Sequence, residues 1–222
     1  KRARCYSTHH QSETEADEFF KNILGESHLN DCFLLLKDFD LDKIRRRRTN
    51  IDIESYPRAG ILIPLCKNRD QEPSILFTLR SSQMGTHKWE ISFPGGKESN
   101  VDEGDIVKTA IRESIEEIGI SEKIIQPFGS LKPITSNNGN LAVYPVLSLV
   151  HLNFNSNAKV FYPNTSEVED IFLLPIREAC NPKHWHYTRW KHGIVTPVYY
   201  DKVFNGIQVP RIWGLTAGLL YF

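Results

Sequence analysis

The sequence has no excess of charge of either sign and few cysteines. Its 222 residues include 27 lysines and arginines against 27 aspartates and glutamates, so bulk electrostatics gives no reason to expect a nucleic-acid partner. The four cysteines lie far apart, with neither a Cys-x-x-Cys pair nor a Cys/His metal-binding spacing: Cys5, Cys32, Cys66 and Cys180. We therefore expect reduced thiols in an intracellular protein and no disulfide framework.

Long apolar runs and internal repeats are also missing. No stretch approaches the roughly 20 apolar residues that a membrane-spanning helix needs, and the chain contains no repeat or low-complexity segment. Hydrophobic residues make up 40% and charged residues 24% of the chain, which is typical of a soluble globular protein with one well-developed core. The sequence leaves the oligomeric state undetermined.

Residues 1–57 are predicted to form an extension that precedes a domain at 58–222. Lys1–Ser12 is basic, rich in hydroxyl residues and free of acid, which suits the end of a mitochondrial transit peptide, although a disordered terminus with chance arginines would look the same. Short helices are expected over Thr14–Gly25 and Leu34–Phe39. The run Arg45–Arg48 could steer an anionic substrate but is more simply a solvated linker.

The domain itself shows strand-like segments around one long helix. The turn-like segments Asn68–Pro73 and Ser136–Asn140 each separate two strands, and the first pair reads as a hairpin. The expected strands are Ala59–Cys66, Ser74–Leu79, Glu90–Phe93, Ile124–Leu131, Leu141–Phe154, Asp170–Leu174, Ile194–Tyr200 and Gln208–Trp213. Further helices are expected over Ile176–Cys180 and Gly214–Phe222. This order predicts an α/β sandwich.

The long helix carries the residues suited to chemistry. Gly95 and Gly96 open a loop that passes through an acidic segment into the helix, and Gly119 ends it, because glycine adopts the left-handed conformation at little cost. At about 100° per residue, a mostly apolar stripe forms along one side, consisting of Val107, Ala110, Ile111, Ser114, Ile115 and Ile118. Towards its C-terminal end, the helix also carries Arg112, Glu113, Glu116 and Glu117.

Three carboxylates on one side of a helix repel one another. Glu113 and Glu117 are four residues apart and therefore stacked neighbours, and Glu116 flanks them. A solvated acidic face would tolerate this at a cost of about a few tenths of a kcal/mol per pair, and charge runs are usually just solvated. A divalent cation would turn the repulsion into a site, because Mg²⁺ takes carboxylate oxygens together with substrate phosphates.

The whole pattern resembles the Nudix box, G-x5-E-x7-R-E-U-x-E-E-x-G-U with U apolar. The matching residues are Gly96, Arg112, Glu113, Glu116, Glu117, Gly119 and Ile120. The chain departs from the motif twice: the interval from Gly96 to Arg112 is two residues longer, and Ser114 stands at the first apolar position. The role of the first acidic residue of the motif could pass to Asp102, Glu103 or Asp105.

The resemblance implies a metal-dependent hydrolase of a nucleoside diphosphate linked to another group, built on a mixed sheet between helices. It implies that Glu113 and Glu117 hold Mg²⁺ or Mn²⁺ with Glu116 as a third ligand, and that Arg112 orients the carboxylates. Bound metal would neutralise the bridging oxygens and lower the pKa of the attacking water. Glu113, Glu116 and the later Glu167 are all candidates for the catalytic base.

A second motif precedes the box. The segment Leu79–Gly96 is similar to the pattern L-R-S-x-x-L-x-x-H-x-G-x-V-S-F-P-G-G of the coenzyme A diphosphatases of this superfamily, the mitochondrial-type members most of all, with Trp89 in place of a glycine. The resemblance extends roughly from Arg58 to the end and includes Asn164–Pro175 and Arg211–Ala217. It implies that the substrate-binding residues are Arg80, Ser81, His87, Lys88, Gly95 and Gly96.

Arg80 suits bidentate contact with a phosphate, because its guanidinium is a planar donor of several hydrogen bonds. A surface salt bridge would also account for Arg80, and a structural hydrogen bond within the loop would account for His87.

Together these features predict hydrolysis of coenzyme A and its acyl thioesters to 3′,5′-ADP and 4′-phosphopantetheine or its acyl form. The alternatives are a Nudix hydrolase of NADH or ADP-ribose, and an inactive nucleotide-binding module with the same fold. The lengthened loop favours the inactive module, whereas the intact glutamates argue against it. The preferred acyl chain does not follow from the sequence.

Overall fold

The computed structural model describes residues 18–20, 22–38, 53–136, 140–154, 159–189, 195–200 and 211–221. Its strands are β1 (Arg58–Lys67), β2 (Pro73–Arg80), β3 (Ile91–Ser92), β4 (Gly95–Lys97), β5 (Ile125–Ser130), β6 (Ile134–Thr135), β7 (Ala142–Val150), β8 (Val168–Pro175), β9 (Trp185–Arg189) and β10 (Val195–Tyr199). Its α-helices are α2 (Glu26–Leu36), α4 (Ile106–Ile118), α5 (Ile176–Ala179) and α6 (Gly214–Tyr221). Short 3-10 turns cover Ile53–Ser55, Asn100–Asp102, Glu122–Ile124 and Pro182–His184.

Strands β1 to β8 form one mixed sheet. Its main order is β3-β2-β1-β7-β5, with β4 beside β1, β6 beside β7 and β8 beside β2. β1 runs parallel to β7 from Arg58↔Ala142 to Cys66↔Val150 and antiparallel to β2 and β4. A strand with parallel pairing and cover on both faces is expected to be continuously apolar, as β1 is from Ile61 to Cys66. β9 and β10 form a separate two-stranded sheet.

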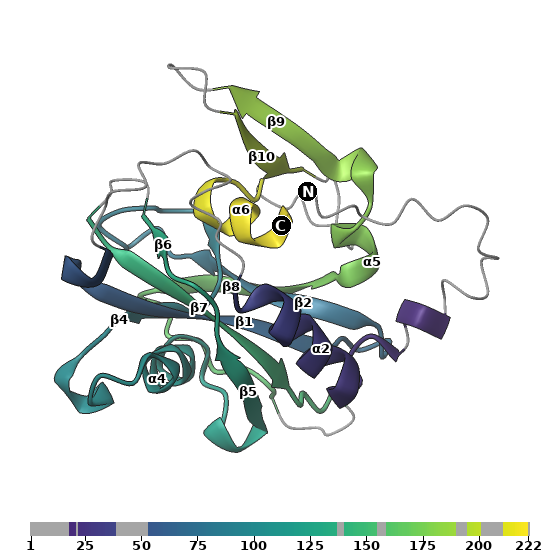
Figure 1. Cartoon of the computed structure of the whole chain (residues 1–222), viewed down its shortest axis with the longest axis horizontal. Coiled ribbons are helices and arrows are strands. Elements are labelled where there is room, and N and C mark those ends of the chain that lie inside the picture. Colours follow the sequence, from purple (N-terminus) through teal and green to yellow (C-terminus); the bar gives the residue numbers. More distant parts are fainter. Residues whose placement is uncertain are drawn as a thin grey trace.

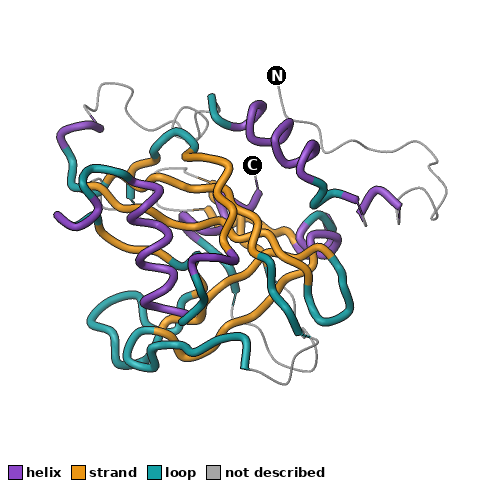
Figure 2. Tube along the Cα trace, turned by 90° about the horizontal axis from the view of Figure 1, so that it is seen from below, coloured by secondary structure: helices purple, strands orange, loops and turns teal. Residues whose placement is uncertain are grey.

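Helices cover both faces of this sheet (Figure 1). α4 lies below it and packs on a core that includes Leu62, Leu76 and Val146; from below, in Figure 2, it lies in front of the strands. α2, α5 and α6 cover the opposite face, where the rings of Phe77 and Phe93 lie 4.8 Å apart between centroids. The predicted α/β sandwich with a mixed sheet is therefore confirmed.

Gly60 on β1 lets α4 approach the sheet closely. A Cβ at this position would lie 2.7 Å from the carbonyl oxygen of Ile106 and 2.9 Å from the amide nitrogen of Ala110. Both distances are shorter than a carbon side chain tolerates, so a larger residue would push the helix away. The close approach places the face of α4 that carries the glutamates beside β4.

Several predicted elements are confirmed and others need correction. The β1–β2 hairpin, the long helix ending at Gly119, and helices α5 and α6 lie where the sequence indicated. β4, β6 and β9 were not predicted. The helix expected over Leu34–Phe39 instead begins at Glu26. Of the helix expected over Thr14–Gly25, residues 18–20 and 22–25 are described, and only 18–20 and 22 are helical. Lys1–Ser12, Arg45–Arg48 and residues 208–210 lie outside the described residues, and Ile212 forms only an isolated bridge with Tyr199.

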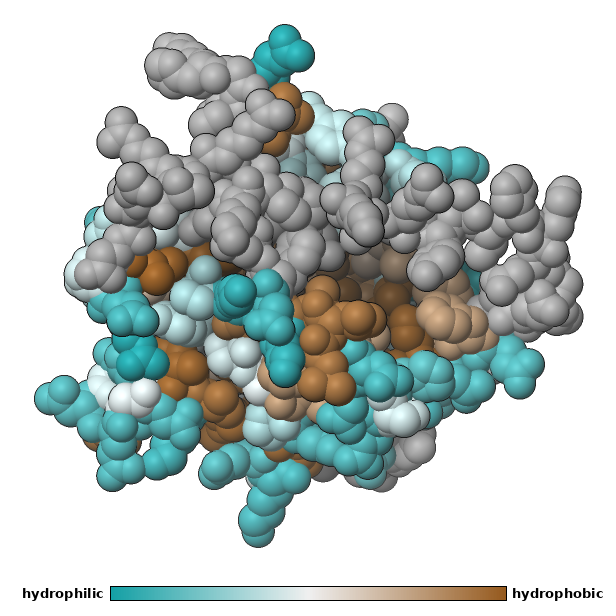
Figure 3. Space-filling model, in the orientation of Figure 1, coloured by the Kyte–Doolittle hydropathy of each residue, from teal (hydrophilic) through white to brown (hydrophobic). Residues whose placement is uncertain are grey.

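The described part of the predicted N-terminal extension packs onto the sheet. Leu24 and Leu29 are buried in the core on the side of α2, and the side-chain amide of Gln126 donates to Glu26 across 3.3 Å. The end of α2 leaves Leu34 57% and Leu35 79% exposed, and apolar side chains gather over this part of the face in Figure 3. None of the helices described has both the length and the apolar character to span a bilayer.

Candidate active site

Helix α4 is a well-capped platform for the site. The Asp105 carboxylate accepts hydrogen bonds from the backbone amides of Val107 (2.9 Å) and Lys108 (3.3 Å), which satisfies donors that the first turn leaves unpaired. Gly119 ends the helix in the left-handed conformation, at φ 67°. Ser114, which departs from the family pattern, is buried, and its hydroxyl donates to the Ala110 carbonyl at 2.7 Å. The helix therefore accepts this serine without an unpaired polar group.

The two glycines of β4 bring the backbone against the α4 carboxylates. Gly95 has φ 146°, and a Cβ there would overlap the carbonyl oxygen of Gly60. A Cβ at Gly96 would overlap the Glu113 carboxylate. Glycine is thus required at 95 by the backbone and at 96 by the side chain beneath it.

Glu117 is the most enclosed carboxylate of the predicted metal site. It is 5% exposed, and its Oε2 accepts a hydrogen bond from the Gly95 amide at 3.0 Å. Burial raises the pKa of Glu117 to about 7, against the lowering effects of the Gly95 hydrogen bond and the Arg80 charge. The charges of Glu167 and Glu113 raise this pKa further. A positive charge brought to this position would therefore relieve a real electrostatic cost.

Glu113 belongs to the same electrostatic group. Partial burial raises its pKa, the Arg112 charge and hydrogen bond oppose the rise, and the charges of Glu116 and Glu167 add to it. Glu113, Glu117 and Glu167 thus act on one another although Glu167 lies far away in sequence. Glu167 is held there because its backbone carbonyl accepts a hydrogen bond of 2.8 Å from the Ser81 amide.

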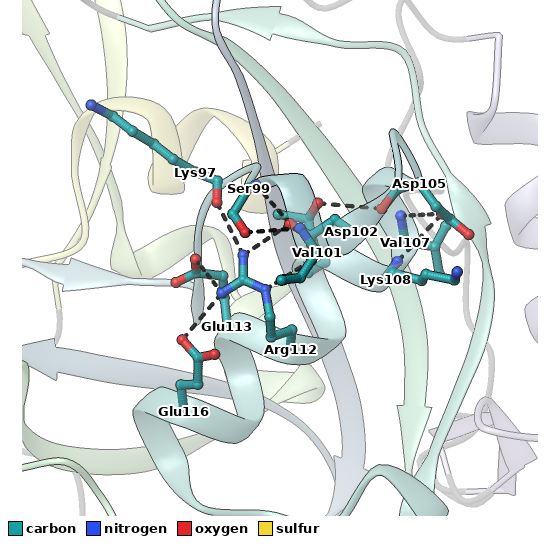
Figure 4. Close-up of polar contacts among 12 residues, drawn as sticks. Lys97, Ser99, Val101, Asp102, Asp105, Val107, Lys108, Arg112, Glu113 and Glu116 are labelled. Atoms are coloured by element: carbon teal, nitrogen blue, oxygen red, sulfur yellow. Dashed lines mark hydrogen bonds and ion pairs between the residues drawn. The ribbon is translucent and has the colours of Figure 1, made fainter.

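Arg112 stands among carboxylates at the start of the site (Figure 4). Its Nε and Nη2 donate to the two oxygens of Asp102 at 2.8 and 3.0 Å, and Nη2 also donates to the Lys97 carbonyl at 3.1 Å. Its Nη1 forms ion pairs with Glu113 (2.9 Å) and Glu116 (3.1 Å). These partners stabilise the charged form of Arg112, and they raise the pKa of its guanidinium.

The lengthened loop gives its three acids three different roles. Asp102 is buried and pairs with Arg112, Glu103 pairs with Lys108 at 2.8 Å on the surface, and Asp105 caps α4. The hydrogen bonds from Arg112 hold the pKa of Asp102 well below its usual range. Asp102 is therefore the acid that meets the box arginine. The sequence carried a signal for this that was missed: Ser99 and Asp102 have the spacing of a capping box, which the structure forms.

The residues predicted to bind substrate lie in different surroundings, and Arg80 and Ser81 at the end of β2 already differ. Arg80 ends β2 within electrostatic reach of Glu117, and its buried Nε has no hydrogen-bond partner among the described atoms. Ser81 is fully buried, and its hydroxyl accepts from the Gln83 amide, so it shapes the loop and presents no surface to a substrate.

His87 and Lys88 are both exposed, in a loop that the structure leaves open to solvent. His87 has φ 57° and pairs with Glu90 at 3.0 Å. Its Nδ1 is therefore already engaged within the loop, in agreement with the alternative that His87 forms a structural hydrogen bond there.

Glu113 and Glu117 have the donor chemistry that a divalent cation requires, and Glu116 stays the predicted third ligand. Among the described residues no group of three or more His, Cys, Asp or Glu side chains is arranged to hold a metal ion. Glu116 is 57% exposed at its side chain and forms an ion pair with Arg112. Glu113 and Glu117 remain as hard oxygen donors that face the glycines, and Mg²⁺ usually binds through one or two carboxylates plus substrate phosphates.

Comparison with known proteins identifies the family of the chain. Residues 56–192 match the model of the NUDIX domain. Proteins named "Uncharacterized Nudix hydrolase NudL" from Yersinia pestis (strain Pestoides F) and Yersinia pseudotuberculosis (serotype O:1b, strain IP 31758) are 34% identical over 165 residues, which is 73% of this chain and 76% of each relative.

Similar solved structures include the M. smegmatis Nudix hydrolase RenU (TM-score 0.44, 12% identity, 55% of this chain and 72% of that one). A MutT/nudix family protein from Enterococcus faecalis is also similar (TM-score 0.44, 13% identity, 96% and 73%). On the strength of the family model and the NudL relatives, the chain belongs to the Nudix family. It is a Nudix hydrolase, a member of a diphosphatase family that is generally dependent on divalent metal.

Proposed function

We propose that this Nudix hydrolase cleaves the diphosphate bond of coenzyme A and acyl-CoA, with Mg²⁺ or Mn²⁺, to 3′,5′-ADP and 4′-phosphopantetheine or its acyl form. The observation that carries the proposal is the buried Glu117 carboxylate, held by the Gly95 amide within reach of the Arg80 charge. This arrangement would bring a metal-binding acid on α4 and a phosphate-binding cation at the end of β2 together beside β4. The similarity of Leu79–Gly96 to the motif of coenzyme A diphosphatases supports this choice of substrate.

Different residues bind the cation, bind the phosphates and contact the metal-binding carboxylates in this proposal. Glu113 and Glu117 hold the cation, which when bound neutralises the phosphate oxygens and favours ionisation of a water. Arg80, whose charge acts on Glu117, supplies the cation for the diphosphate or for the 3′-phosphate. Arg112 contacts Glu113 through Nη1 and Oε1 alone, which leaves the other Glu113 oxygen for the cation. Rate enhancement then comes from positioning and charge neutralisation, as is usual for phosphoryl transfer.

Glu167 is the best placed of the three candidate bases. Glu113 and Glu116 are both already engaged by Arg112 in ion pairs. In the described part of the chain, the Glu167 side chain accepts a hydrogen bond from the Asn164 amide at 3.3 Å and forms no ion pair with an arginine. Its charge acts on both Glu113 and Glu117, so Glu167 belongs to the same carboxylate group and is the base that we favour.

The test is hydrolysis of a substrate panel by wild-type protein and two arginine variants. Coenzyme A, dephospho-coenzyme A, NADH and ADP-ribose are incubated with Mg²⁺, and the products are separated by chromatography. We expect coenzyme A to be preferred over dephospho-coenzyme A by roughly ten-fold or more in kcat/KM, since charge-assisted hydrogen bonds are at stake. Arg80→Ala should weaken coenzyme A hydrolysis strongly. Arg69→Ala, an exposed arginine beyond the opposite end of β2, is the matched control and should not.

The outcomes show which phosphate Arg80 contacts and whether coenzyme A is the substrate. A loss in Arg80→Ala that is confined to coenzyme A assigns the arginine to the 3′-phosphate, whereas equal losses on both coenzymes assign it to the diphosphate. Faster hydrolysis of NADH or ADP-ribose than of coenzyme A by the wild-type protein would remove the proposed substrate and leave a Nudix hydrolase of another dinucleotide.

A further inference from the structure

The hydrogen bonds of Arg112 divide its guanidinium into two sides. Nε and Nη2 face Asp102 and the Lys97 carbonyl, while Nη1 alone faces the helix carboxylates Glu113 and Glu116 (Figure 4). A guanidinium binds a carboxylate most strongly through two parallel hydrogen bonds, and Asp102 occupies that fork. Glu113 therefore receives a single nitrogen of Arg112, through its Oε1.

We propose that Asp102 is a positioning residue that keeps Arg112 from capturing Glu113, so that this carboxylate stays available to a divalent cation. The inference rests on the proposed metal-dependent function and deepens it. Arg112 and a cation bound by Glu113 would compete for the same carboxylate oxygens, because both are positive and Arg112 already contacts Glu113. Asp102 decides this competition by holding the two donors that would otherwise complete a bidentate Arg112–Glu113 pair.

Asp102 is fixed firmly enough for this task. It is 2% exposed, and its Oδ2 accepts the backbone amide of Ser99 at 2.8 Å as well as Arg112 Nη2. The Ser99 side chain completes a reciprocal capping box around the turn Asn100–Asp102. Beyond it Glu103 and Gly104 both take left-handed conformations, at φ 55° and 80°, and the Gly104 carbonyl accepts from Arg58 at 3.2 Å. The two additional residues of this loop are thus accommodated in an anchored turn that presents Asp102 to the arginine.

Loss of the Asp102 charge would release Arg112 towards the helix. An asparagine at 102 has one acceptor oxygen where Asp102 has two, so it cannot reproduce the bidentate pair with Nε and Nη2. The freed donors would then find Glu113 and Glu116 one and four residues away on the same helix. A cation would have to displace the arginine before it could bind.

The loop itself supplies matched controls. Glu103→Gln and Asp105→Asn remove the same unit of charge as Asp102→Asn from positions within three residues, so long-range electrostatic effects on a bound cation are similar. Glu103 pairs with Lys108 on the surface and Asp105 caps α4, a role that asparagine also performs. Neither contacts Arg112 in the described structure.

The experiment measures Mn²⁺ binding to substrate-free protein by electron paramagnetic resonance, with circular dichroism to confirm folding. We expect Asp102→Asn to weaken Mn²⁺ binding about ten-fold or more, the usual scale for loss of a residue that orients a metal ligand. Glu103→Gln and Asp105→Asn should stay within about two-fold of wild type, as screened surface charges do. If Asp102→Asn loses its fold, Asp102→Ser, which offers Arg112 a single uncharged oxygen, should show the same weakening.

Removal of the arginine provides the decisive comparison. In the double variant Asp102→Asn/Arg112→Gln no guanidinium competes, so Mn²⁺ affinity should return to the wild-type level or exceed it. A merely structural role for Asp102 would leave the double variant as weak as the single one. That result, or an Asp102→Asn affinity equal to that of Glu103→Gln, overturns the inference while the proposed function stands. Failure of the wild-type protein to bind Mn²⁺ overturns both.

Discussion

At the scale of single residues, Gly96 and Glu113 are so close that no side chain fits between them. A Cβ at 96 would overlap the Glu113 carboxylate, the movable end of its side chain, and not the backbone. Gly96→Ala should therefore fold, with a stability change within about 1 kcal/mol, but displace Glu113 and reduce metal affinity by about ten-fold or more. Mn²⁺ titration and thermal unfolding measure the two effects separately.

Gly85→Ala is the control for that substitution. It lies in the loop before the site, and a Cβ there would meet nothing within 4 Å. Equal Mn²⁺ affinities for the two alanine variants would show that Glu113 does not need its position beneath Gly96.

Glu117 gives the site a pH dependence of stability in the absence of metal. Its pKa is about 7 in the folded protein against an ordinary value of 4.5, chiefly because of burial. A carboxyl group whose pKa is raised by folding contributes stability below its unfolded pKa, and this contribution is lost as the pH rises through the folded value. We expect the free energy of unfolding in a chelator to fall between about pH 4.5 and 7, and Glu117→Gln to flatten this part of the curve. A Glu117→Gln profile parallel to wild type would contradict the assignment.

At the scale of elements, the cap of α4 can be separated from the chemistry that the helix carries. The Asp105 side chain accepts two backbone amides of the first turn. Asp105→Ala should lower the free energy of unfolding by about 1 kcal/mol, whereas Asp105→Asn should have little effect, because asparagine caps as well as aspartate. Urea denaturation measures both. A large loss in the asparagine variant would show that the charge matters beyond the cap.

The elements also show which parts of the fold the sequence could predict. Periodicity and end signals located α4, and the turn residues located the β1–β2 hairpin, because both signals are local. β4 escaped prediction because its two glycines have low strand propensity; they pair with β1 through close backbone contact that only the tertiary structure supplies. β9 escaped because most of its residues are exposed, so no alternation marks it.

The candidate site was predictable in composition but less so in arrangement. The motif identified Arg112, Glu113, Glu116 and Glu117, and helical spacing alone would make the three glutamates equivalent. The structure distinguishes them: Glu117 is buried against Gly95, and Glu116 is turned to Arg112. Asp102 was one of three candidates because the partner that selects it, Arg112, is ten residues away and reached through a turn that the motif does not describe.

At the scale of the whole molecule, α2 joins the core on the face opposite α4. Leu29 is 2% exposed and Leu35 is 79% exposed on the same helix. Leu29→Ala should therefore cost about 2–5 kcal/mol of unfolding free energy, and Leu35→Ala less than about 0.5 kcal/mol. Similar small costs for both variants, measured by chemical denaturation, would mean that this helix is not part of the folded unit.

We propose that a cation held by Glu113 and Glu117 is needed to hydrolyse the diphosphate of coenzyme A. The most direct measurement follows product formation from coenzyme A by chromatography with Mg²⁺, with chelator, and in Glu117→Gln, which keeps the side-chain shape but removes its charge. The exposed Glu122→Gln, just beyond the helix, is the matched control. We predict 3′,5′-ADP and 4′-phosphopantetheine from wild type and Glu122→Gln with Mg²⁺, none with chelator, and turnover lower by roughly 10²-fold or more in Glu117→Gln. Near wild-type turnover by Glu117→Gln in saturating Mg²⁺ would contradict the account.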